Sequence, residues 1–308
     1  MRLSTFLLGI LAAAILGGGV WDYQTREQAR LRLRVLAAQL EPLGQLQYQE
    51  LRAHPWGQGS VEQLRFLPSP DTARRLRLPA GAELRVDALE VDRYRESGDG
   101  IPEKFEARLR GLHWPASTTV TSGPEVGDPA EQPLPSLGEL GYQELRFDGR
   151  LRLQYLRDAG ALQLAFALRD PSAARLDGEL SLFAEPAVFR GEWQSLTLSQ
   201  LRLDYRDLGL LARLKPLLAL RARVSNEGLD AALVTRLERE TRQRGLRWPA
   251  EDYAALVGFL REARGLRIRM DPPGELRLRD LPLYAEADLP QVLGLELRPP
   301  PVGATTPP

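Results

Sequence analysis

Residues 145–168 read LRFDGRLRLQYLRDAGALQLAFAL, and apolar side chains occupy alternate positions on both sides of the turn at residues 158–160. Alternation with a period of two is typical of β-strands that bury one face. The pattern continues as far as Tyr205, after further turns at residues 170–172 and 185–186. We therefore predict an antiparallel β-meander with one apolar face.

The apolar face of this meander has to be covered by the protein's own helices, by a second sheet, or by the alkyl chains of a ligand. Ten side chains on this face are the candidates for contact with a lipid or a partner protein: Leu151, Leu153, Tyr155, Leu162, Leu164, Phe166, Leu180, Leu182, Leu198 and Leu203. Coverage by the protein itself and coverage by a lipid both remain open from the sequence.

Residues 43–114 form a first β-rich piece. Within it, Glu83–Val91 reads ELRVDALEV, and its apolar residues stay on one side only if the alternation slips by one position after Val86. Residues 115–138 are rich in Pro, Gly, Ser and Thr without periodicity, which predicts a linker or exposed loop. The second β-rich piece then spans residues 139–297.

The pentapeptide YQELR occurs twice, at residues 48–52 and at residues 142–146. Each copy stands at the opening of one β-rich piece. This placement suggests a duplicated or stacked strand unit.

The strand pattern is interrupted near residues 228–264, where two amphipathic helices are expected. Leucines recur every fourth position from Leu229 to Leu237, and Pro249 opens the second helix. Covering the sheet is the simplest role for these helices, and binding a partner is the alternative. Residues 298–308 read RPPPVGATTPP and predict a disordered, polyproline-like tail.

The N-terminal segment from Thr5 to Trp21 contains seventeen residues without a charge. Such a segment can just cross a bilayer as a helix, so we predict a transmembrane signal anchor over residues 1–23, and a cleaved signal peptide is the alternative. Residues 24–42 lack Gly and contain Pro only at position 42, which favours a helical stalk.

Four arginines follow this segment closely: Arg26, Arg30, Arg32 and Arg34. Read literally, the positive-inside rule would keep the large domain in the cytoplasm. The layout of a short tail, one Arg, an apolar run and small residues is that of a bacterial signal anchor, and we therefore expect the bulk of the chain in the periplasm.

The composition excludes several classes of function. The 41 Lys and Arg balance the 41 Asp and Glu, so there is no basic footprint for nucleic acid. Cysteine is absent, which removes disulfides, thiol catalysis and thiolate metal sites. No motif for binding nucleotides, zinc or calcium occurs. We accordingly expect no cofactor, no metal ion and no catalytic residue, although a dispersed triad around His54 or His113 stays open.

The stretch from Leu201 to Arg213, the helical insert after it, Phe259-Leu260, Leu266–Ile268 and Pro272-Pro273 together resemble bacterial envelope proteins of the AsmA-like kind and related single-anchor periplasmic proteins. The resemblance covers the anchor and residues 139–283 and includes no catalytic residue. AsmA-like proteins form curved sheets with a hydrophobic groove and are linked to phospholipid transport and outer-membrane assembly. This chain is much shorter than the members that bridge the periplasm.

The sequence thus predicts a mainly β (α+β) protein, in which an N-terminal transmembrane helix precedes a curved antiparallel β-sheet region with two inserted helices. The expected function is that of a non-enzymatic, inner-membrane-anchored periplasmic protein that binds a lipid or an envelope partner through its apolar sheet face. The alternative is a structural or assembly subunit of an envelope or secretion complex, with a self-covered core and no lipid ligand.

Overall fold

The computed structural model describes residues 34, 37–38, 40–54, 58–76, 81–97, 101–115, 135–190 and 195–300. The predicted anchor, most of the predicted stalk, residues 116–134 of the predicted linker and residues 301–308 of the predicted tail lie outside these ranges. No helix within the described ranges is long and apolar enough to cross a membrane.

The chain divides into two compact units. The described residues of the first unit run from 34 to 115, from 136 to 170 and from 181 to 196, and those of the second comprise residue 135, residues 171–180 and residues 197–300. The predicted second β-rich piece, residues 139–297, is therefore divided: residues 139–170 and 181–196 belong to the first unit and the rest to the second.

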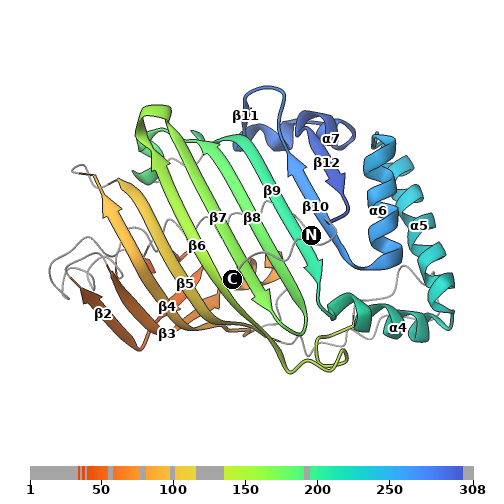
Figure 1. Cartoon of the computed structure of the whole chain (residues 1–308), viewed down its shortest axis with the longest axis horizontal. Helices are drawn as coiled ribbons and strands as arrows, with labels where there is room; N and C mark the ends of the chain where they lie inside the picture. The colour runs from red at the N-terminus through yellow and green to blue at the C-terminus, as the bar shows by residue number, and fades with distance from the viewer. Residues whose placement is uncertain are drawn as a thin grey trace. The chain divides into compact units, whose positions relative to one another are not determined.

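The first unit is built from antiparallel strands (Figure 1). Two short strands, β1 (Gly44–Gln47) and β2 (Glu50–His54), both pair with β3 (Gln58–Pro68). After β3 come β4 (Leu84–Glu96), β5 (Pro102–Pro115), β6 (Glu144–Leu156) and β7 (Ala161–Asp170), each paired with the strand before it. Helix α3 (Pro70–Leu76) and the 3-10 helix η3 (Pro186–Arg190) complete the unit.

The turn predicted at residues 158–160 in this unit is confirmed. The turn between β6 and β7 is a 3-10 turn over Arg157–Ala159, closed by Gly160 with a φ of 55°. A left-handed residue of this kind is where glycine is favoured. The two YQELR copies each start a strand, at Glu50 for β2 and at Glu144 for β6.

The second unit contains β8 (Ala174–Phe183) up to Leu180, followed in the sheet by β9 (Thr197–Asp207), β10 (Gly265–Met270) and β12 (Leu295–Arg298), while β11 (Leu276–Arg277) pairs with β9. Its helices are α4 (Leu210–Ala222), α5 (Asn226–Gln243), α6 (Ala250–Glu262) and α7 (Leu289–Val292). Helices α5 and α6 confirm the predicted insert, and α6 packs against β12 and β10.

The mainly antiparallel β architecture agrees with the prediction, but α4 was missed. This helix contains Pro216, which lacks an N–H and interrupts the hydrogen bonding of the turn before it. At the start of α4, the Asp207 carboxylate accepts hydrogen bonds from the backbone N–H groups of Gly209 and Leu211 at 3.1 and 2.8 Å. Such a carboxylate at a helix start satisfies the donors that the first turn leaves open.

Asp252 on α6 is 2% exposed, and its Oδ1 accepts a hydrogen bond from the backbone N–H of Leu297 on β12 at 2.8 Å. We expect Asp252→Ala to lower the free energy of unfolding by about 1–3 kcal/mol, because a buried backbone donor would lose its acceptor. Equilibrium urea unfolding measures this change. Glu251→Ala is the matched control. The Glu251 side chain pairs with Arg298 but is 78% exposed, so its removal should lower the free energy of unfolding by less than about 1 kcal/mol. Equal losses of stability in the two variants would contradict the role of Asp252 as a buried acceptor for the Leu297 N–H.

Candidate functional site

The ten candidate apolar residues are all buried, and none is more than 8% exposed. Leu153 on β6 and Leu162 on β7 are fully buried. Those on β6 and β7, together with Leu182, belong to the first unit, whereas Leu180, Leu198 and Leu203 belong to the second. The proposed contact of these residues with a lipid or partner stays a prediction, and their side chains occupy the interior of the protein.

Parts of the cover over these apolar side chains come from the chain itself. In the first unit, the Tyr155 hydroxyl donates a hydrogen bond to the carbonyl of Ala184 at 3.1 Å. The Tyr155 ring also packs edge-on against the ring of Phe189 on η3, with 5.0 Å between the ring centroids. In the second unit, Tyr205 on β9 makes an edge-on contact with Phe259 of α6 at 6.0 Å. Such contacts between aromatic rings stabilise a packed core beyond the area that they bury.

The opposite face of the first unit carries a row of basic residues, three arginines and one histidine, in directly opposed positions on four neighbouring strands. Arg65 on β3 faces Arg85 on β4, which faces His113 on β5, which faces Arg146 on β6. Neighbouring strands lie about 5 Å apart, so the backbone alone brings these groups close together. Like charges directly opposite each other are unfavourable unless carboxylates separate them.

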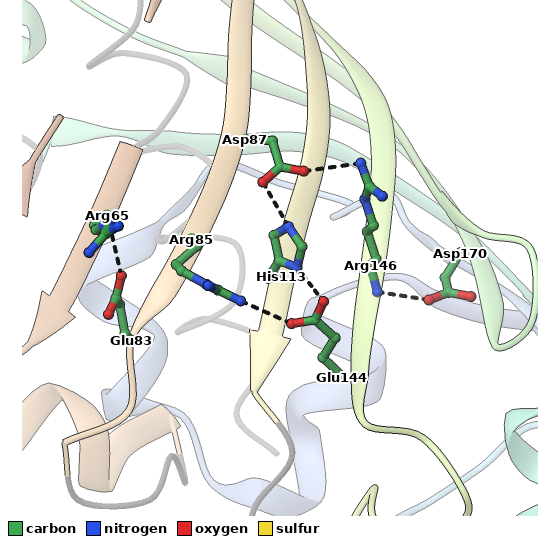
Figure 2. Close-up of polar contacts among 8 residues, drawn as sticks. All are labelled: Arg65, Glu83, Arg85, Asp87, His113, Glu144, Arg146 and Asp170. Atoms are coloured by element: carbon green, nitrogen blue, oxygen red, sulfur yellow. Dashed lines mark hydrogen bonds and ion pairs between the residues drawn. The ribbon is translucent and has the colours of Figure 1, made fainter. Parts of the chain in front are cut away.

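Carboxylates lie between these basic side chains, and His113 stands at the centre of the resulting contacts (Figure 2). Its Nε2 lies 2.9 Å from Oδ1 of Asp87, and its Nδ1 lies 2.8 Å from Oε1 of Glu144. Each carboxylate also accepts from an arginine: Asp87 from Arg146 at 3.0 Å, and Glu144 from Arg85 at 3.1 Å. We call these five residues the His113 cluster.

The His113 cluster is partly shielded from water. The side chain of His113 is 12% exposed, while those of Asp87 and Glu144 are 36% and 37% exposed. The backbone N–H of Arg146 donates to Asp170, a carboxylate that is 4% exposed. Arg65 makes a separate ion pair with Glu83 at 3.4 Å. The contacts of the cluster and of Arg146 with Asp170 therefore link β4 to β7 on the polar side of the sheet.

The His113 cluster sits where the pairing of the strands is irregular. Asp87 lies between Gln63 on β3 and Gly111 on β5, and both have positive φ angles, 52° and 59°. The β5–β6 register also shifts between Leu109 and Leu112. The slip predicted after Val86 stays a prediction, because the printed register shifts of β4 come later, between Val91 and Arg93 and between Arg95 and Glu96. The shift beside Gly111 is a β-bulge between β5 and β6, a feature that re-aims side chains and is frequent beside functional sites.

Gly111 is required at this bulge for two reasons. A Cβ there would lie 2.1 Å from Oδ2 of Asp87, and its backbone has a left-handed φ. Its N–H donates to Oδ1 of Asp148 on β6 at 2.7 Å. The bulge therefore lets the Asp87 carboxylate approach the backbone of β5 and reach His113.

Two copies of one short motif flank His113. Residues 83–87 read ELRVD and residues 144–148 read ELRFD, on strands β4 and β6 at the two sides of β5. The arginine of each copy binds a carboxylate of the other. This pair of motifs was not predicted, because the YQELR repeat overlaps only its second copy. The recurrence of Glu-Leu-Arg-x-Asp was the signal that could have found four of the five cluster residues.

The second histidine, His54, ends β2, opposite Gln58 on β3. His113 has carboxylates on both ring nitrogens, so neither nitrogen faces a serine or threonine hydroxyl as a triad requires. In the described part of the chain, no group of three or more His, Asp or Glu residues is arranged to hold a metal ion.

Further ion pairs continue along the polar face of β4, β5 and β6. Arg108 lies 2.6 Å from Asp92 and 3.5 Å from Glu90, and Arg152 lies 3.3 Å from Glu106. The hydrogen bond to Asp92 and the charge of that carboxylate raise the pKa of the Arg108 guanidinium. Exposed pairs of this kind contribute little to stability individually.

The fold and the cluster together define a mainly antiparallel β protein with a helical insert and an ion-paired polar face. A model for a family of uncharacterised proteins matches residues 154–299, which run from the end of β6 through β12. No curated protein matches the chain at a significant level. The matched part includes the helical insert and excludes the His113 cluster.

Proposed function

We propose that this protein is a non-enzymatic structural or assembly subunit of the bacterial envelope, tethered to the inner membrane by Thr5–Trp21, with a self-covered core in the periplasm. The burial of all ten candidate apolar residues carries this proposal, because a side chain that is packed inside its own chain is not available to line an open lipid groove. The envelope location rests on the apolar N-terminal segment and on the resemblance to AsmA-like proteins.

The His113 cluster supports the non-enzymatic part of the proposal. A general acid or base must reach the proton of a substrate, and a nucleophile needs a neighbouring base. Both ring nitrogens of His113 already lie within hydrogen-bond distance of carboxylates, and each of these carboxylates forms an ion pair with an arginine. Their use in catalysis would require breaking these contacts first.

Extraction of the full-length chain in mild detergent, followed by native mass spectrometry, tests the proposal. We expect a membrane protein partner to co-purify and the chain to carry no phospholipid. One phospholipid retained per chain, and lost on Leu164→Arg under conditions where this variant remains folded, would instead support the lipid-binding alternative. A carboxyl-terminal reporter active only in the cytosol would overturn the periplasmic assignment.

A further inference from the structure

The ring of His113 joins three strands, and the number of protons on its two nitrogens decides which of its contacts are hydrogen bonds. An ionised carboxylate only accepts hydrogen bonds, and a neutral imidazole has only one N–H. The arginine on each carboxylate favours its ionised form. Two ionised carboxylates on the two ring nitrogens therefore match a ring that is protonated at both Nδ1 and Nε2.

The loss of one ring proton would leave a nitrogen lone pair facing a carboxylate oxygen at less than 3 Å. That contact would change from a charge-assisted hydrogen bond to a repulsion between two acceptors. Either β4, through Asp87, or β6, through Glu144, would then lose its bond to the ring of β5.

The groups that face the ring come from each strand beside it. β4 contributes Arg85 and Asp87, and β6 contributes Glu144 and Arg146. Two more carboxylates bind backbone N–H groups nearby, Asp148 that of Gly111 and Asp170 that of Arg146. The arginines keep their charge at all accessible pH values, and imidazole is the kind of side chain that commonly gains or loses a proton in the physiological range.

We propose that the His113 cluster is a proton-dependent clamp across the β-bulge at Gly111. With a doubly protonated ring it ties β4 and β6 to β5, and with a neutral ring it releases one of the two strands. The bulge interrupts the ladder between β5 and β6 from Leu109 to Leu112, so the side-chain contacts add restraint where backbone pairing is interrupted. The clamp would make the stiffness of this part of the first unit depend on the pH around it.

Hydrogen exchange of the backbone amides of residues 109–113 in the full-length protein, corrected for the intrinsic effect of pH on exchange, tests the clamp. In the wild-type protein we expect local opening to increase about tenfold between about pH 6 and about pH 8.5, the size expected for one charge-assisted hydrogen bond. His113→Gln should abolish this dependence, and His54→Gln, which changes the only other histidine, should preserve it.

Glu144→Gln provides a second variant in case His113→Gln does not fold. Its amide can donate to a neutral Nδ1 while Nε2 donates to Asp87, so a neutral ring keeps both contacts and the pH dependence should disappear. Proton-coupled ¹⁵N spectra of the histidine ring, recorded across the same pH range, give an independent readout: the clamp requires two ring protons where it is closed and one where it is open. An opening that is equally pH-dependent in wild type and His113→Gln, or a ring with one proton throughout this range, would overturn the proposal.

Discussion

Leu153→Ala is expected to lower the free energy of unfolding by about 2–5 kcal/mol, the range seen when a leucine is removed from a packed core. Leu153 on β6 directly faces Phe105 on β5 and Leu164 on β7, and none of the three side chains is more than 2% exposed. Truncation would leave a cavity bounded by these neighbours. Equilibrium unfolding in urea, followed by circular dichroism, measures the loss.

Arg152→Ala is the matched control, because Arg152 is the neighbouring residue on the other face of β6 and its side chain is 66% exposed. The loss of its ion pair with Glu106 should cost less than about 1 kcal/mol. A cost for Leu153→Ala no larger than that of Arg152→Ala would mean that Leu153 lines an open surface. The comparison therefore separates a self-covered core from a lipid-lined groove.

Gly111→Ala is expected to lower the free energy of unfolding by about 1–3 kcal/mol through backbone strain, and by more through the collision with Asp87. The left-handed φ of 59° disfavours any side chain at this position. The added Cβ would also displace the Asp87 carboxylate from His113 and Arg146. Thermal unfolding and the histidine ring spectra should report the loss of stability and of the His113 cluster together.

Gly81→Ala separates the two effects. Gly81 also has a positive φ, 74°, but a Cβ at this position would meet nothing within 4 Å. It should therefore show the backbone strain alone and leave the ring spectra of His113 unchanged. If Gly111→Ala costs no more than Gly81→Ala and the ring spectra remain those of the wild type, the close approach of Asp87 to the bulge is not a constraint on the fold.

The strands of the meander were predictable because alternation is a local property of the chain. The positions of β6, β7, β8 and β9 follow from leucine, phenylalanine and tyrosine at every second residue, bounded by Gly160 and by the turns at residues 170–172 and 185–186. Helices α5 and α6 were predictable for the same reason, since their apolar residues recur at helical spacing.

Helix α4 was not predictable by the same reading. Its leucines occur on several sides of the helix and Pro216 lies inside it, so neither the periodicity nor the breaker signal favours a helix. The Asp207 carboxylate that satisfies its first turn belongs to the preceding strand β9. A strand that runs almost directly into a helix offers no loop to mark the change.

The His113 cluster depends on register, which no local pattern fixes. Asp87, His113 and Glu144 are separated by 26 and 31 residues in the chain and meet only because β4, β5 and β6 pair with a bulge at Gly111. The slip expected after Val86 concerns β4, whereas the bulge lies between β5 and β6. It could not show which residues of β5 and β6 would lie opposite it.

Labelling of single cysteines introduced into the cysteine-free chain shows whether the apolar face of the sheet is the interior of the protein. Leu164→Cys and Arg152→Cys would be treated in membranes with a charged maleimide and with an apolar one. We predict that position 164, which is 2% exposed, reacts with neither reagent until the protein is unfolded, while position 152 reacts readily. Labelling of position 164 by the apolar maleimide in the folded protein would show instead that the apolar face is open to a ligand.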